Sequence, residues 1–183
     1  MSDPIKPKTE CLADFTSTMN PGEVRSIPVS SLSRDDWRQI RESNPVETVQ
    51  AHMNAGSDRD LVIVSVGMIE RLLAELVRRS RGGNLLRLRS DLNSLTQYAF
   101  ENGLIEDRDR IGIDAVRHVR NEFAHDAALT SMEYDDSIQS HLSTTGLGGR
   151  PPGLSIRQHF GIVAMGLCGH LHHLVAIGVD RAE

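Results

Sequence analysis

The sequence predicts an all-α fold, and two observations support this prediction. Apolar residues recur at spacings of three and four in several segments, which is the period of one helix face. No segment alternates between apolar and polar residues over a useful length, as a half-buried strand would. The chain has 183 residues, of which 39% are hydrophobic and 25% charged. These values predict one domain of ordinary size with a packed core.

The chain begins with a segment that predicts no regular structure. Residues 1–33 carry four prolines among serines and threonines without sustained periodicity, which is typical of a mobile N-terminal arm. The helical domain is expected to span residues 34–183. Ser33 and Asp36 have the spacing of a capping box for a first short helix. Pro45 is expected to end or kink this helix, and a second short helix to follow as far as His52.

The clearest helix is predicted over residues 57–81. Ser57 is expected to cap it, with Asp60 at the third helical position. Apolar residues follow at helical spacing: Val62, Val66, Ile69, Leu73, Leu76 and Val77, with Leu61 and Leu72 widening the stripe. Gly82 and Gly83 are expected to stop the helix.

Further helices are predicted over residues 85–101, 106–125, 132–142 and 155–179. Asn102 and Gly103 are expected to end the first of these. Residues 144–153 are rich in glycine and proline and predict a flexible loop. Short loops favour antiparallel neighbours, so we expect an antiparallel helical bundle.

Composition excludes several classes of function. The formal net charge is −5, which argues against a protein that coats nucleic acid through a generally basic surface. Only seven residues are aromatic, too few for a stacking platform that reads single-stranded RNA. The two cysteines, Cys11 and Cys168, predict no disulfide framework or metal cluster.

No membrane association is expected. The first residues contain no apolar run of the kind found in signal peptides. The most apolar stretch, residues 160–179, is interrupted by glycines and by His170, His172 and His173. We therefore expect a buried helix of a soluble bundle and a cytoplasmic protein.

The segment with the most chemical information is residues 114–126. On a helix, Asp114, His118, Asn121 and His125 share one polar face. One interpretation takes Asp114 and His118 as an orienting acid and a general base, although such surface pairs are common. Another takes Glu122 and His125 as half of a di-iron carboxylate site. That site needs a second Glu-x-x-His pair, which the sequence lacks, so no metal and no cofactor is predicted.

The third interpretation is a family resemblance. Arg120-Asn121-x-x-Ala124-His125 resembles the Arg-x4-His signature of the HEPN superfamily of small helical domains. Further strings occur in matching order: Ser57-Asp58-Arg59-Asp60, Leu72-Leu73-Ala74-Glu75-Leu76, Asn102-Gly103-Leu104-Ile105 and Glu133-Tyr134-Asp135-Asp136-Ser137-Ile138. Together they resemble the mannitol operon repressor (MltR) family, which is HEPN-like, over roughly residues 57–175. The resemblance implies a HEPN-like antiparallel helical bundle.

The resemblance implies two functional alternatives. The favoured one is a regulatory interaction protein without enzymatic activity, acting on transcription without a recognised DNA-binding motif. A protein partner is then expected, and a homodimer is compatible. In this alternative Arg120 and His125 are structural, and Arg120 pairs with Asp135 or Asp136. Removing Arg120 would then leave a buried acid unpaired and cost roughly 1–3 kcal/mol.

The other alternative is a metal-independent endoribonuclease, which in this superfamily is generally a dimer. His125 would shuttle a proton at the 2′-hydroxyl, Arg120 would hold the phosphate, and Asn121 belongs to the same signature. Imidazole titrates near neutrality and guanidinium binds phosphate with two hydrogen bonds, so both residue types suit this chemistry.

Two other groups of residues invite a functional interpretation. Five arginines without an intervening acid could bind an anion: Arg78, Arg79, Arg81, Arg87 and Arg89. A solvated helical corner is the commoner explanation, so contact with nucleic acid is not favoured. Cys168 and His172 have the i, i+4 spacing of zinc ligands, but no third ligand is indicated and a packed helix is favoured.

Overall fold

The computed structural model describes residues 44–81, 91–126, 128–145 and 150–177, and all regular secondary structure within these ranges is helical. The elements are α3 (Pro45–Ala55), α4 (Asp58–Ser80), α5 (Leu92–Glu101), α6 (Asp107–His125), the 3-10 helix η2 (Met132–Tyr134), α7 (Asp136–Ser143) and α8 (Ile156–Ile177). The all-α prediction is confirmed. The predicted N-terminal arm, the helix after Ser33, the Gly82-Gly83 stop and residues 146–149 of the glycine-rich loop lie outside the described residues.

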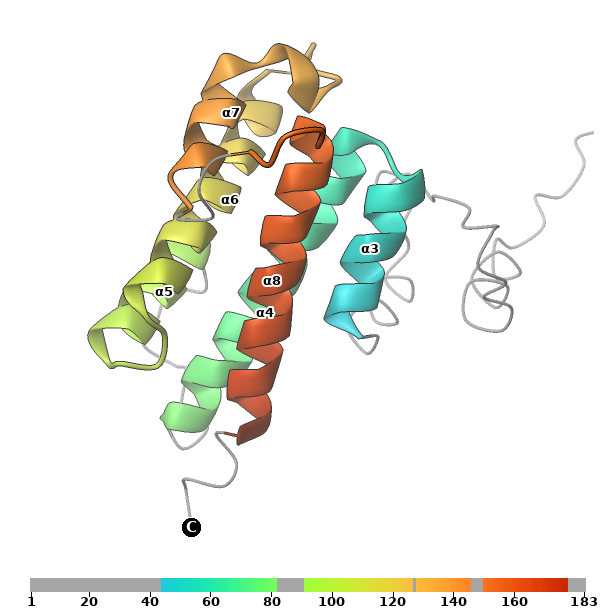
Figure 1. Cartoon of the computed structure of the whole chain (residues 1–183). Coiled ribbons are helices and arrows are strands. Elements are labelled where there is room, and N and C mark those ends of the chain that lie inside the picture. Colours follow the sequence, from blue (N-terminus) through green and yellow to red (C-terminus); the bar gives the residue numbers. More distant parts are fainter. Residues whose placement is uncertain (1–43, 82–90, 127, 146–149, 178–183) are drawn as a thin grey trace, which may run out of the picture.

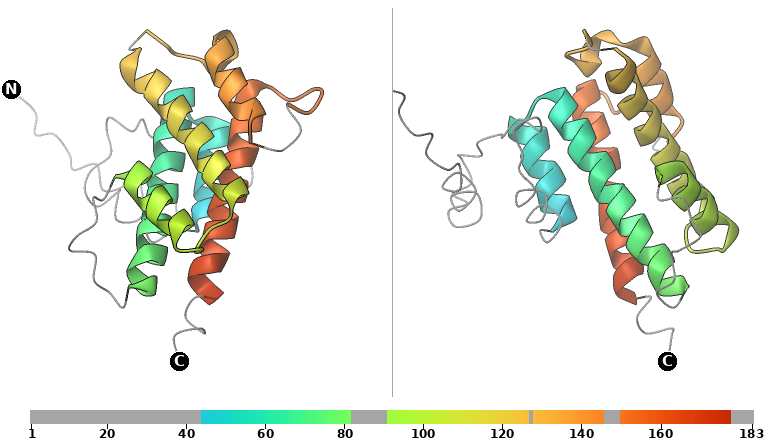
Figure 2. Two further views of the ribbon diagram at one scale, coloured as in Figure 1. Left: turned by 90° about the vertical axis from the view of Figure 1, so that its left-hand side faces the viewer. Right: turned by 180° about the vertical axis from the view of Figure 1, so that it is seen from behind.

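The two longest helices, α4 and α8, lie side by side in the centre of the fold (Figure 1). α3 packs against both of them on one side, and α5, α6 and α7 lie on the other. The side view shows α6 crossing obliquely over the central pair (Figure 2). The core is a cluster of buried hydrophobic side chains that is centred on α4 and α8 and receives residues from every other helix.

The central pair corrects the prediction of a purely antiparallel bundle, because α4 and α8 run in the same direction (Figure 1). Asp58 at the start of α4 pairs with Arg157 at the start of α8. Arg79 at the end of α4 donates to the carbonyl of Val175 near the end of α8 at 2.8 Å. The chain between them folds out through α5 and back through α6 and α7. Helix α8 therefore begins at the same end of the bundle as α4.

Helix α4 matches its prediction closely. Ser57 accepts the backbone N–H of Asp60, and Asp60 accepts the backbone N–H of Ser57, so the capping box is complete. The predicted apolar stripe is buried along its whole length. Such a cap contributes about 1 kcal/mol, and burial of the stripe supplies most of the stability of the helix.

One predicted helix boundary is wrong and another is extended. The short helix predicted as far as His52 is α3, which Asn44 caps, which has Pro45 at its first position and which continues to Ala55. Residues 132–142 form two elements instead of one helix. Asp135, in an extended conformation between them, accepts the N–H groups of Ser137 and Ile138 and so starts α7 afresh.

Helix α5 begins at Leu92, where Asp91 accepts the backbone N–H of Ser94. It ends as predicted at Asn102 and Gly103. Gly103 has a positive φ of 67°, and the N–H of Leu104 reaches back to the carbonyl of Ala99 at 2.8 Å. This is the Schellman ending, which directs the next residues towards α4 and α8.

Candidate functional site

The signature Arg120–His125 forms the C-terminal part of α6. Arg120 and His125 are exposed, and Asn121 is partly exposed. The guanidinium of Arg120 donates to the side-chain oxygen of Asn121 at 3.3 Å. His125 is the last helical residue, and Asp126 follows it as the C-cap. The signature therefore lies on the surface.

The predicted network of Arg120 with Asp135 or Asp136 is not formed within the described part of the chain. Asp135 accepts backbone N–H groups at the start of α7, and Asp136 is exposed. The charge of Arg120 instead affects the pKa of Glu70 in α4. Burial raises the pKa of Glu70, and the charge of Arg120 offsets part of this rise.

The backbone that follows the signature is held by long-range contacts. Arg59 of α4 donates to the carbonyl of Asp126 at 3.2 Å and to that of Leu129 at 3.5 Å. The carboxylate of Asp126 accepts the N–H of Ala128 at 2.8 Å. These bonds fix the end of α6 to the start of α4, so His125 sits on a supported helix end.

Two residues before the signature, His118 of α6 stacks on His141 of α7. The rings of His118 and His141 are parallel within 13°, with centroids 4.4 Å apart. Asp114, expected to orient His118, pairs with Arg117 at 3.3 Å. Burial lowers the pKa of His118, and the charge of Arg117 and the neighbouring His141 lower it further. The Asp114–His118 interpretation is thus weakened, since the carboxylate is engaged elsewhere.

The segment that contains Arg78, Arg79 and Arg81 has less net positive charge than these arginines suggest, because Glu75 lies one turn before it. Glu75 accepts hydrogen bonds from Arg78 at 2.7 Å and from Arg79 at 2.6 Å. These bonds, led by those from Arg78, lower the pKa of Glu75 to about 2. Arg81 lies over the ring of Tyr98, with 5.1 Å to its centroid. Arg87 and Arg89 lie outside the described residues.

The candidate metal ligands are not brought together. Cys168 is fully buried, and burial raises the pKa of its thiol to about 12. His172 is exposed, one turn further along α8. Glu122 contacts Ser137 at 3.1 Å and His141 at 3.9 Å. Among the described residues there is no group of three ligands suited to a metal ion.

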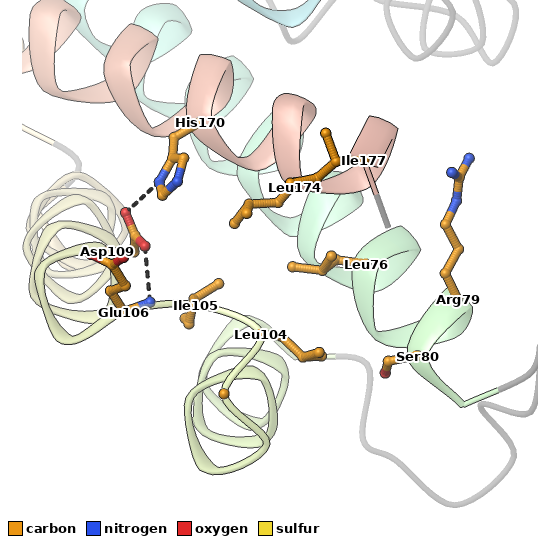
Figure 3. A pocket seen from close by; sticks show the side chains of 11 residues that line it. Leu76, Arg79, Ser80, Leu104, Ile105, Glu106, Asp109, His170, Leu174 and Ile177 are labelled. Carbon is orange, nitrogen blue, oxygen red and sulfur yellow. Dashed lines mark hydrogen bonds and ion pairs between the residues drawn. The ribbon is translucent and has the colours of Figure 1, made fainter. Parts of the chain in front are cut away.

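A pocket that sequence reasoning missed lies at the other end of the bundle. It has a volume of about 550 Å³ and is enclosed by α4, the turn after α5, the start of α6 and the end of α8 (Figure 3). In its wall, Nδ1 of His170 lies 2.8 Å from Oδ1 of Asp109. The spacing of Glu106 and Asp109 as a helix cap signals this acid in the sequence, but the partner His170 is 61 residues away.

No protein-family model matches the chain, and neither the curated proteins nor the solved structures contain a significant match to it.

Proposed function

We propose that the protein is a regulatory interaction module similar to the mannitol operon repressor family, acting on transcription through a protein partner. Its contact surface would be the exposed C-terminal part of α6, residues 120–125. The observation that carries this proposal is the exposure of Arg120 and His125. Exposed polar side chains contribute little to stability, so their place in the sequence is better explained by a partner than by the fold.

The geometry supports a rigid recognition surface. Arg120 is oriented by Asn121, and the chain after His125 is held by Arg59. A pre-positioned side chain loses less entropy on binding than a free one. Arginine and histidine also present donors to a partner's acidic groups or carbonyls.

Charge pairing favours a protein over a nucleic acid as the partner. Within the described ranges the following arginines each lie within 4.0 Å of a carboxylate: Arg78, Arg79, Arg108, Arg110, Arg117, Arg150 and Arg157. Binding to phosphates depends on cations that are free to replace counterions. A surface of paired charges instead suits a partner with its own mixed charges, including a second copy of this chain.

We also propose a cytoplasmic location. Helix α8 is long and apolar enough to cross a membrane, with a mean hydropathy of 1.6. In the fold it packs between α3, α4 and α6 and buries Phe160 and Leu171 completely. The role of a core helix accounts for its composition.

Site-specific photo-crosslinking in the native cell tests the interaction proposal. A photoreactive amino acid at position 124, in place of the exposed Ala124, should give a discrete adduct that mass spectrometry identifies as one protein. The same substitution at the exposed Gln97 of α5 is the matched control and should not give that adduct. Equal adducts at both positions, or none at position 124, would contradict the proposal.

A second candidate, the metal-independent endoribonuclease, is favoured by the same exposure, because a catalytic pair must reach its substrate. Labelled structured and unstructured RNA in EDTA would then yield 2′,3′-cyclic phosphate ends. His125→Ala should abolish this cleavage, whereas His173→Ala, which alters an exposed histidine of α8, should not. The interaction module predicts intact RNA with all three proteins.

A further inference from the structure

We propose that the pocket between α4, α6 and α8 binds a small neutral molecule with an apolar body and one hydroxyl group. This site is independent of the proposed contact surface on α6. Its volume of about 550 Å³ is in the range of pockets that enclose small ligands. We call it the His170 pocket.

Aliphatic side chains form one part of the wall of the His170 pocket. They are Leu76, Leu104, Ile105, Leu174 and Ile177 (Figure 3). These side chains come from α4, the turn after α5 and the end of α8, so three separate parts of the chain shape one cavity. Apolar walls bind the apolar part of a ligand by removing its surface from water.

The polar groups around the pocket are largely engaged with one another. Both oxygens of Asp109 are used, one by Nδ1 of His170 at 2.8 Å and the other by the backbone N–H of Glu106 at 3.0 Å. Arg79 is bound to Glu75 and to the carbonyl of Val175. Asp109 therefore has both oxygens occupied, and two of the three guanidinium nitrogens of Arg79 already donate.

Nε2 of His170 has no hydrogen bond within the described structure, so it is open to a ligand. A carboxylate can only accept, so Asp109 fixes the proton of a neutral imidazole on Nδ1. Nε2 is then an acceptor, and a ligand hydroxyl can donate to it. The carboxylate of Asp109 also makes the ring a better acceptor, as carboxylates do when they bind the second nitrogen of metal-binding histidines.

Charge selects a neutral ligand over an anionic one. Asp109 is 6% exposed at its side chain, and the carboxylate of Glu106 is close by at the rim. The charge of Glu106 is paired with Arg108 and that of Arg79 with Glu75, so the buried Asp109 is the charge that an entering carboxylate would meet among the described lining residues. An alcohol avoids this repulsion and keeps the same hydrogen bond.

Titration of the full chain with n-octanol and octanoate, followed by two-dimensional proton–nitrogen NMR, tests the inference. These probes share a chain length and differ in the head group. We expect n-octanol to shift the resonances of Leu104, Ile105 and the His170 ring, and octanoate to bind at least several-fold more weakly. Absence of shifts with n-octanol, or tighter binding of octanoate, would overturn the proposal.

Two variants locate the site. His170→Ala should weaken n-octanol binding about two- to tenfold, the effect of losing one hydrogen bond. His172→Ala, which alters an exposed histidine on the same helix, is the matched control and should bind as the parent does. Leu104→Trp should fill the cavity and abolish binding even where His170→Ala folds poorly. Unchanged binding in Leu104→Trp would place the probe elsewhere and refute the His170 pocket.

Discussion

Asp58 and Arg157 form an ion pair that joins the first turns of α4 and α8 and sets these helices parallel. Arg157 also donates to the carbonyls of His52 and Gly56, each at 2.6 Å. The second oxygen of Asp58 accepts the N–H of Met132 at 2.7 Å. One largely buried pair thus connects α3, α4, η2 and α8, and it supports the end of the bundle where α6 presents its signature.

Replacing Arg157 should be the most damaging change at this end of the bundle. Arg157→Ala leaves Asp58 and several carbonyls without their partner, and breaking a buried pair costs about 3 kcal/mol. For a domain of this size we expect a fall of about 6–12 °C in melting temperature. Arg150→Ala is the control, because its contact with Glu133 is exposed and 3.9 Å long. Equal losses in both variants would refute this role of Arg157.

Two glycines should respond in opposite directions to alanine. Gly103 has a φ of 67°, so Gly103→Ala strains the backbone and should cost about 1 kcal/mol, although a Cβ there meets no neighbour. Gly166 lies inside α8, and a Cβ there also has open space. Gly166→Ala should stabilise the protein by up to about 1 kcal/mol. Chemical denaturation measures the free energy of unfolding of both variants. A change of the same sign in both variants would contradict this prediction.

Stability should fall as the pH is lowered through the ordinary titration range of histidine. Burial lowers the pKa of His118 and of His159 in the folded state. The unfolded chain therefore binds more protons just below about pH 6.5, and stability is lost as the pH falls from there towards the folded pKa. His118→Gln should flatten this decline, whereas His173→Gln, an exposed control, should leave it unchanged. A decline that His118→Gln does not alter would exclude its contribution.

Features determined by neighbouring residues could be predicted from the sequence. The capping box of Ser57 and Asp60 and the helix end at Gly103 depend on contacts within a few residues. The buried stripe of α4 followed from helical periodicity alone. The short helix after Asn44 also followed from local signals, because proline is well suited to the first position of a helix.

Features that depend on the path of the whole chain could not be predicted. The acid near Arg120 is Glu70, which lies in another helix, and the predicted partner Asp135 is used locally as a cap. The pairing of His170 with Asp109 joins the last helix to the start of α6. Periodicity places each side chain on a face of its own helix but does not show which face meets which.

The central claim is that the signature belongs to the surface of α6, and the thermal melting of Arg120→Ala and His125→Ala, alone and combined, tests it most directly. Surface changes of this kind alter stability by no more than about 0.5 kcal/mol each. We therefore predict melting temperatures within about 2 °C of the parent for the single variants and an additive result for the pair. A fall of roughly 4–8 °C in either single variant would show that the residue supports the core, and would contradict the account.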